Sequence, residues 1–299
     1  MKNTVISSII AGMFCLLSMA SCSSPAQQDN DLKLSENWFI QSSAEICHDG
    51  AALSDGSVGC EGWYKASVPS TVMGVLTAEN GEYEDAFVGR NYAEIDRERF
   101  DTAWWYRTSF DVPALKEGQR AELAFDGVSY RADVWLNGVQ IASADEFYGP
   151  FRQFSFDVTD ALKESNNLAV RIHRWQKGEF NIGFVDWNPR PVDESMGIFR
   201  PVWLKYSNEV AMKNPVVRSK VDTVSFDEAW LTVEATLCNA SDRNISGKLC
   251  GKYEEGSFSY PVELAAGETK TVSLTADQVR KLHVKNPRLW WCHNLGNPE

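Results

Sequence analysis

The sequence is short of histidine and of basic residues. Only 4 of its 299 residues are histidine, and 29 Lys and Arg stand against 41 Asp and Glu, which gives a formal net charge of −12. A protein that binds nucleic acid needs a basic face that releases counterions, so this composition argues against a nucleic-acid partner. The histidines are scattered, and no pair of cysteines has metal-ligand spacing beside one of them. We therefore predict neither a metal site nor a cofactor.

Long apolar runs are absent after residue 22, so no membrane-spanning helix is predicted there. The one apolar run, residues 5–19, follows a charged start and is too short to cross a bilayer. It leads into small residues, which is typical of an export signal.

A cysteine closes this first segment. Cys22 directly follows Ala20-Ser21, an arrangement that resembles the lipidation motif of bacterial lipoproteins, although Met19 stands where that motif usually has leucine. We expect residues 1–22 to be a lipoprotein signal peptide, with Cys22 as the lipidated residue, and residues 23–30 to be a solvated tether. The protein would then be an exported bacterial lipoprotein, periplasmic or at the cell surface, that meets the membrane only through its lipid anchor.

The number of cysteines beyond the signal is odd. Five cysteines remain beyond the signal, so at least one thiol is free unless it pairs between chains. Cys238 and Cys250 flank a turn-rich segment and could face each other across two strands, while Cys47 and Cys60 bracket a Gly/Ser loop. We interpret these four and Cys292 as structural or inert rather than catalytic.

Strand patterns dominate the chain from residue 100 onward. Hydrophobic residues make up 43% and charged residues 23%, as in an ordinary globular protein with a core. Residues 104–112 are rich in aromatic and β-forming residues, which predicts a half-buried strand. Alternation places Trp104 and Trp105 on opposite faces of that strand, so we expect at least one of them to pack outside the core of its own sandwich.

The clearest hairpin surrounds Asn137-Gly138, a dipeptide that supplies the two positive-φ residues of a type I′ turn. A two-residue loop predicts that Leu136 pairs with Val139 and Val134 with Ile141.

Residues 31–208 as a whole are predicted to be antiparallel β with long connections, which indicates a jelly-roll β-sandwich. One short capped helix is expected over residues 72–80, after Ser70-Thr71.

A second all-β unit is predicted over residues 209–299. Strand candidates separated by turn residues occur at the interval of an immunoglobulin-like sandwich, at residues 216–224, 230–237, 245–253, 258–264 and 270–274. Such a sandwich needs about seven strands. We therefore expect this second domain to be incomplete at its C-terminal end.

Seven short strings, in order along the chain, carry a family resemblance. They are Val68-Pro69-Ser70-Thr71-Val72, Trp104-Trp105-Tyr106-Arg107, Val134-Trp135-Leu136-Asn137-Gly138, Gly149-Pro150-Phe151, Asp186-Trp187-Asn188-Pro189, Met196-Gly197-Ile198-Phe199-Arg200-Pro201-Val202 and Pro287-Arg288-Leu289-Trp290-Trp291. Together they resemble glycoside hydrolase family 2, in the branch of exo-β-glucosaminidases and β-mannosidases. The resemblance implies a jelly-roll sugar-binding domain, then an immunoglobulin-like domain, then a catalytic (β/α)8 barrel.

The catalytic residues that the resemblance implies lie outside this chain. Retaining glycosidases use two carboxylates about 5 to 5.5 Å apart, and in this family both are glutamates of the barrel, which would follow residue 299. We predict no catalytic residue here and expect residues 23–299 to be inactive as a hydrolase.

Three residues are the candidates for substrate binding. In the mannosidase branch an Asp-Trp pair on a loop of the sugar-binding domain reaches the active site, and the resemblance gives that role to Asp186 and Trp187. The alternative is that Asp186 caps a turn and Trp187 packs between strands. Asn91 falls where relatives place a loop residue near the substrate, and the alternative for Asn91 is a turn.

The function expected is therefore that of a non-catalytic N-terminal portion of a retaining glycosidase. Its partners would be a carbohydrate, with a β-mannoside or a β-glucosaminide favoured, and the missing catalytic barrel. A stand-alone carbohydrate-binding lipoprotein and a non-functional gene fragment are the alternatives.

Overall fold

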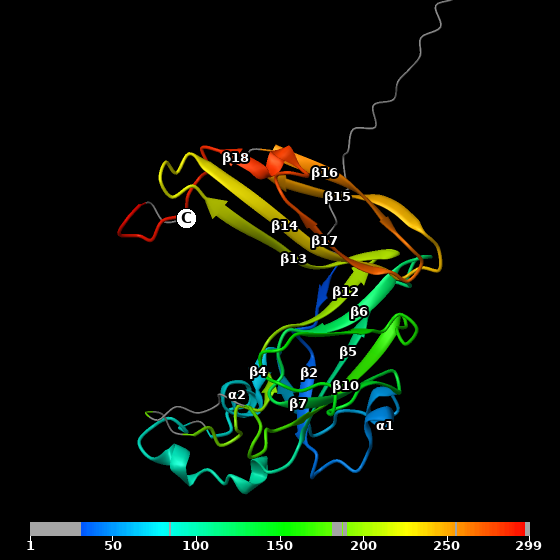
Figure 1. Ribbon diagram of the computed structural model, residues 1–299. Coiled ribbons are helices and arrows are strands. Elements are labelled where there is room, and N and C mark those ends of the chain that lie inside the picture. Colours follow the sequence, from blue (N-terminus) through cyan, green and yellow to red (C-terminus); the bar gives the residue numbers. More distant parts are fainter. Residues whose placement is uncertain (1–30, 84, 181–186, 188–189, 255, 297–299) are drawn as a thin grey trace, which may run out of the picture. The chain divides into compact units, whose positions relative to one another are not determined.

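The computed structural model describes residues 31–83, 85–180, 187, 190–254 and 256–296, and strands predominate throughout (Figure 1). The predicted Cys22 site and Asp186 lie outside these residues. Strands β1–β12 form two large antiparallel sheets and one small one. The four-stranded sheet has the order β1 (Leu32–Lys33), β12 (Val202–Ser207), β6 (Arg120–Phe125), β9 (Phe154–Asp157). The six-stranded sheet has the order β3 (Tyr64–Ala66), β2 (Trp38–Ser42), β5 (Trp104–Asp111), β10 (Ser165–His173), β7 (Arg131–Leu136), β8 (Val139–Ala142).

The main core lies between these two sheets because alternate side chains point inward from each strand. Trp38 and Tyr106 enter it from the six-stranded sheet with their ring centroids 6.5 Å apart in an edge-to-face contact. Leu123 and Phe125 enter it from β6 and are fully buried. This architecture confirms the predicted all-β jelly-roll sandwich.

A second, smaller core covers the outer face of the six-stranded sheet. It is closed by an outer segment, residues 43–63, which contains the helix α1 (Gly50–Ser54). Trp105 and Trp135 pack there with their ring centroids 5.5 Å apart, beside Leu53. Trp104 belongs to the main core. The prediction that one of the two adjacent tryptophans packs outside the main core is thus confirmed.

The outer segment is tied to the sheet by a buried arginine. Arg107 of β5 donates hydrogen bonds to the carbonyl oxygens of Val58 and Gly59, each at 2.8 Å. Its guanidinium also lies 5.3 Å from the ring centroid of Trp63. Because these donors would be costly to bury without partners, the two carbonyls hold the segment in place.

The predicted hairpin forms, but with a different register. Asn137 and Gly138 have φ values of +53° and +87°, as a type I′ turn requires. Leu136 pairs with Val139 as expected, whereas Val134 pairs with Ala142 instead of Ile141. The prediction for Val134 is wrong because a bulge between Val134 and Trp135 shifts the register by one residue.

The expected helix after Thr71 is present in a modified form. Thr71 Oγ1 accepts a hydrogen bond from the backbone N–H of Gly74 at 3.1 Å, which caps α2 (Val72–Gly74). The helix then continues with π-helical geometry as η1 (Val75–Glu79). The strand β4 (Ser70–Thr71) directly precedes α2 and pairs with β11 (Gly197–Ile198) in the small sheet.

Strands β13–β18 form a second, immunoglobulin-like sandwich. One sheet contains β13 (Val210–Val221), β14 (Glu228–Asn239), β17 (Thr269–Leu274) and, beside one end of β14, β18 (His283–Lys285), which follows η4 (Arg280–Leu282). The other sheet contains β15 (Ile245–Tyr253) and β16 (Gly256–Leu264). Ala235, Leu264 and Leu274 lie in the core between them. All five cysteines of the described residues are free thiols, so neither of the two possible pairings forms in this structure.

No helix within the described ranges has both the length and the apolar character needed to cross a membrane.

Candidate functional site

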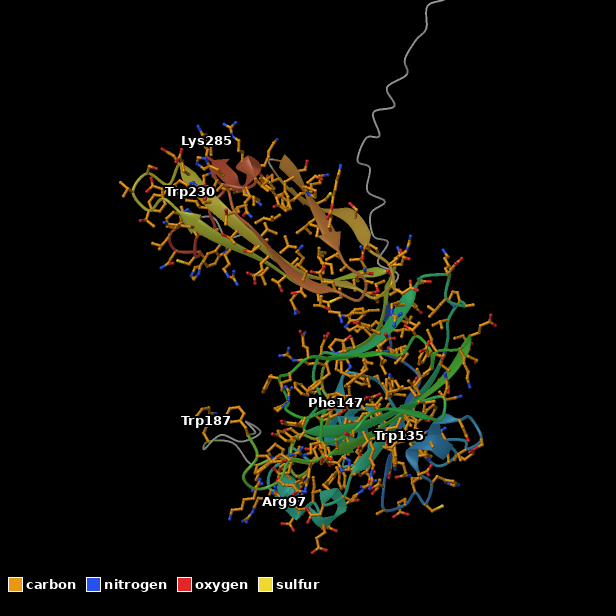
Figure 2. The ribbon with its side chains drawn as sticks, turned by 45° about the vertical axis from the view of Figure 1, so that its right-hand side comes forward. Arg97, Trp135, Phe147, Trp187, Trp230 and Lys285 are labelled. Atoms are coloured by element: carbon orange, nitrogen blue, oxygen red, sulfur yellow. The ribbon has the colours of Figure 1, made fainter. Side chains whose placement is uncertain are left out.

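Two loop segments far apart in sequence meet in the first sandwich. The first, residues 85–101, contains η2 (Asn91–Glu94) and η3 (Glu98–Phe100), and the described part of the second is residues 174–180, 187 and 190–196. Tyr92 Oη accepts a hydrogen bond from the backbone N–H of Val192 at 2.8 Å. Arg97 donates to the carbonyl of Pro191 at 3.1 Å. These two hydrogen bonds therefore join the loops that carry the candidates Asn91 and Trp187. Figure 2 labels Arg97 of the first loop and Trp187 of the second.

Trp187 projects into solvent from the second loop. Its side chain is 86% exposed, whereas Trp38 and Trp104 are fully buried. The alternative interpretation, in which Trp187 packs between strands, is therefore wrong. A free indole face offers an apolar surface to the C–H groups of a sugar ring.

Asn91 has a local structural contact. It begins η2, and its Nδ2 donates to the carbonyl of Asp85 at 3.0 Å. This contact is the turn role that loop asparagines commonly take. Asn91 therefore lies on a loop joined to that of Trp187, but its side chain binds the backbone of its own loop.

Glu194 closes the base of the second loop. Its Oε2 accepts hydrogen bonds from Trp175 Nε1 at 3.1 Å and from Arg190 Nε at 3.0 Å. The Arg190 guanidinium lies 5.1 Å from the centroid of the Trp175 ring. Trp175 and Arg190 stand on either side of Trp187 in sequence, so Glu194 holds together the two ends of the loop that presents it. We call these three residues the loop clamp.

Asp193 fixes the same turn to the helix α2. Its Oδ2 accepts the backbone N–H of Met73 at 2.9 Å, and its Oδ1 accepts the N–H of Ser195 at 2.9 Å. Burial raises the pKa of the Asp193 carboxyl, and these two hydrogen bonds oppose that rise. The Asp193 carboxyl therefore links the base of the loop to α2 through hydrogen bonds.

The loop clamp and the role of Asp193 were not predicted from the sequence. Glu194 and Ser195 have φ values of +53° and +57°. A positive φ is uncommon for both residue types, so it could not be predicted from them. The partners of Glu194 and Asp193 are set by the tertiary structure, as is the pairing of Tyr92 with Val192, 100 residues away. Because neither Glu194 nor Ser195 is a glycine or an asparagine, no residue type in the sequence indicated their positive φ values.

This arrangement is suited to binding rather than to acid–base chemistry. Asp193 and Glu194 are 2% and 6% exposed, and both are committed to internal donors. Within the described residues, no group of three or more His, Cys, Asp or Glu could hold a metal ion. Among the described residues of the two loops, Phe87, Phe180 and Trp187 present large apolar side chains to solvent, with exposed fractions of 78%, 81% and 86%.

Comparison with known proteins identifies what the chain is similar to. Residues 38–179 match the family model described as the glycosyl hydrolase 2 galactose-binding domain-like family. An exo-β-D-glucosaminidase of Streptomyces avermitilis is 37% identical over 261 residues, which are 87% of this chain and 28% of the relative. A β-mannosidase of Rattus norvegicus is 25% identical, over 84% of this chain and 33% of the relative.

A solved structure shows the same fold. The exo-chitosanase of Amycolatopsis orientalis superimposes with a TM-score of 0.81 and 31% identity, over 89% of this chain and 30% of that one. The chain thus spans about a third or less of the length of these relatives.

Proposed function

Because the chain belongs to the N-terminal region of glycoside hydrolase family 2, we propose that it forms part of the rim of a β-glycosidase substrate pocket. The reacting carboxylates of that enzyme would come from a catalytic barrel that this sequence does not contain. The observation that carries the proposal is the exposed Trp187 on a clamped loop, in a chain 37% identical to an exo-β-D-glucosaminidase. Trp187, together with Asp186, would contact the sugar at the edge of the pocket.

The substrate that we propose is a β-linked glucosaminide, with a β-mannoside as the second candidate. Support for this order comes from the relatives, since several exo-β-D-glucosaminidases match the chain at higher identity than the β-mannosidases do. The net charge of −12 also favours the approach of a cationic amino sugar. Breakdown of such glycans outside the cytoplasm would be the biological role.

A chimeric enzyme tests this proposal. Residues 31–299 would replace the matched region of the S. avermitilis exo-β-D-glucosaminidase, and hydrolysis of 4-nitrophenyl β-D-glucosaminide would be compared with that of the β-D-mannoside. We expect the chimera to turn over the glucosaminide faster, and residues 23–299 alone to turn over neither. Hydrolysis by residues 23–299 alone would disprove the proposal, because the reacting groups would then lie within this chain.

Trp187→Ala in that chimera is expected to raise KM for the glucosaminide about twofold to thirteenfold. An aromatic contact contributes about 0.5–1.5 kcal/mol beyond the area that it buries, and this difference in binding free energy corresponds to that range. Trp187→Phe keeps an aromatic face and should retain most of the affinity. Steady-state kinetics over a range of substrate concentrations provide the measurement.

The control variant is Val224→Ala, which changes a side chain that is 90% exposed and follows β13 in the second sandwich. It should leave KM unchanged. An unchanged KM for Trp187→Ala as well would remove Trp187 from the substrate site.

We also propose that the chain is exported and anchored to a membrane by lipid on Cys22. The support is the sequence alone, namely the short apolar run and the small residues before that cysteine. Cys22→Ser is expected to move the protein from the membrane fraction to the soluble fraction and to abolish labelling by a fatty-acid analogue. Cys47→Ser, at an exposed cysteine, is the matched control and should change neither result. Labelling that persists in Cys22→Ser would place the lipid elsewhere.

A further inference from the structure

The first loop carries a phenylalanine whose ring is supported on one face and open to solvent on the other. The side chain of Phe87 is 78% exposed. Its ring stacks on that of Tyr92, with the two centroids 5.7 Å apart and an angle of 22° between the ring planes. Because the rings are nearly parallel, Tyr92 covers one face of Phe87 and leaves the opposite face free.

The turn that carries Phe87 is fixed by hydrogen bonds from Asn91. Its backbone N–H donates to the carbonyl of Val88 at 3.2 Å, and its Nδ2 donates to the carbonyl of Asp85 at 3.0 Å. The backbone N–H of Val88 also donates to the carbonyl of Asp85, at 3.0 Å. These bonds connect the residues on either side of Phe87. A ring that is fixed before its ligand arrives loses less conformational entropy on binding.

Tyr92 attaches this pair of rings to the base of the second loop. Its Oη accepts the backbone N–H of Val192, which directly precedes Asp193. Trp187 lies five residues before Val192 along the chain, and five residues span at most about 18 Å. Phe87 and Trp187 therefore occupy different positions on one joined pair of loops, within reach of a single short oligosaccharide.

The open face of Phe87 is chemically suited to a sugar ring. An aromatic face packs well against the apolar C–H groups of a pyranose. A glycosidic bond within an oligosaccharide has a sugar on each side, one that is retained and one that leaves when the bond is cleaved. The proposed function gives Trp187 a contact with only one of these two sugars. A second aromatic face on the same rim is thus available to the other.

We propose that Phe87 is a second sugar platform of the pocket rim, which stacks on the leaving-group sugar of a β-linked glucosamine oligosaccharide. Tyr92 supports the platform, and Asn91 is a positioning residue that fixes its turn. This inference rests on the proposed function for the class of substrate and for the contact of Trp187 with the other sugar. It gives the joined loops two sugar contacts rather than one.

Two substrates of the chimeric enzyme separate these contacts. Methyl β-D-glucosaminide has no second ring, whereas the β-1,4-linked glucosamine disaccharide has one. We expect Phe87→Ala to raise KM for the disaccharide about twofold to thirteenfold, the range that corresponds to the loss of one aromatic contact. The KM for the methyl glycoside should change less than about twofold, because no ring is present to stack on Phe87. Release of glucosamine measures both reactions.

Two further variants of phenylalanine complete this comparison. Phe87→Trp keeps an aromatic face and should retain most of the affinity for the disaccharide. Phe151→Ala is the matched control, since Phe151 is 54% exposed, contacts the ring of Phe199 and lies outside the two loops. It should leave both KM values unchanged. A selective effect of Phe180→Ala, with none for Phe87→Ala, would place the platform on the second loop and overturn the assignment to Phe87.

Asn91→Asp tests the positioning role. The aspartate has nearly the same shape but cannot donate the hydrogen bond to the carbonyl of Asp85. We expect KM to rise for the disaccharide and to stay unchanged for the methyl glycoside. In a chain that already carries Phe87→Ala, Asn91→Asp should have no further effect on either KM, because the residue acts through Phe87. Additive effects of the two substitutions, or equal effects on both substrates, would remove this role from Asn91.

Saturation-transfer NMR gives a measurement that does not depend on catalysis. The probe is the β-1,4-linked glucosamine trisaccharide, added to residues 23–299 with the aromatic protons of the protein saturated. We expect transfer to the ring C–H protons of the sugar, and a clear loss of that transfer in Phe87→Ala but not in Phe151→Ala. Thermal unfolding of both variants would verify that they fold, as expected for substitutions of exposed side chains.

The possible results distinguish the platform from the proposed function. An active chimera in which Phe87→Ala leaves the ratio of the two KM values unchanged would overturn the platform alone. Equal increases in both KM values would place Phe87 against the same sugar as Trp187 and would also overturn it. An inactive chimera, combined with transfer that depends on Phe87, would overturn the proposed function and leave the sugar contact of Phe87 in place. Inactivity without such transfer would overturn both.

Discussion

Replacing Gly197 with alanine is expected to lower the free energy of unfolding of the first sandwich by about 3 kcal/mol or more. Gly197 lies in β11 with a φ of +149°, and its backbone exchanges hydrogen bonds with Ser129 at 2.8 and 2.9 Å. A Cβ atom would stand 2.7 Å from the carbonyl oxygen of Ser70, from Thr71 Cα and from Tyr106 Oη. Two of these atoms are backbone, so relief of the clash requires β4 and β11 to separate. Urea unfolding monitored by tryptophan fluorescence would measure the loss.

The matched control for Gly197→Ala is Gly62→Ala. Gly62 also has a positive φ, +77°, but a Cβ atom there would meet nothing within 4 Å. Its substitution should cost only the backbone strain of about 1–2 kcal/mol. If both variants lost the same stability, close packing at Gly197 would play no part.

Asp193→Ala is expected to destabilise the first sandwich by about 2–5 kcal/mol. The carboxylate accepts the buried backbone N–H of Met73 and the part-buried N–H of Ser195, and a buried donor left without a partner costs about 1–3 kcal/mol. Because Asp193 joins the base of the Trp187 loop to α2, this loop should also become more susceptible to proteolysis. Thermal unfolding and limited trypsin digestion would report on the two effects separately.

The pH dependence of stability gives an independent measure of Asp193. Burial raises its folded-state pKa above the ordinary value of 3.8, so the folded protein binds a proton that the unfolded chain has released. The contribution of this group is therefore largest at and below pH 3.8 and declines as the pH rises through the folded pKa. The stability difference between the parent protein and Asp193→Asn, which does not titrate, should be larger at pH 4 than at pH 7. A difference that grows with pH would mean that hydrogen bonding outweighs burial.

Local patterns predicted the strands and the turns of this protein well. Asn137-Gly138 indicated its turn because only certain residues adopt two successive positive φ values easily. The pairing predicted for Val134 was wrong because a β-bulge shifts the register beyond the turn. A bulge depends on how the whole strand packs, so the residues around the turn did not indicate it.

The candidate site was predictable in part. The aromatic of the Trp187 loop was found through family resemblance, whereas its supports were not. Glu194 is a single glutamate among many, and its function depends on Trp175 and Arg190 arriving at the same point in the fold. Charged residues are usually solvated, so a buried carboxylate is recognised only when its donors are seen around it.

The outer segment that covers the six-stranded sheet has a consequence for how this scaffold can diversify. Since Arg107 and the Trp105–Trp135 contact seal that side, β5 is buried on both faces from Trp104 to Thr108. This stretch of β5 therefore leaves neither of its faces open as a platform for a glycan. Under the proposed function, new sugar preferences would arise by exchanging residues in the joined loops, while the strands beneath them stay constrained by packing.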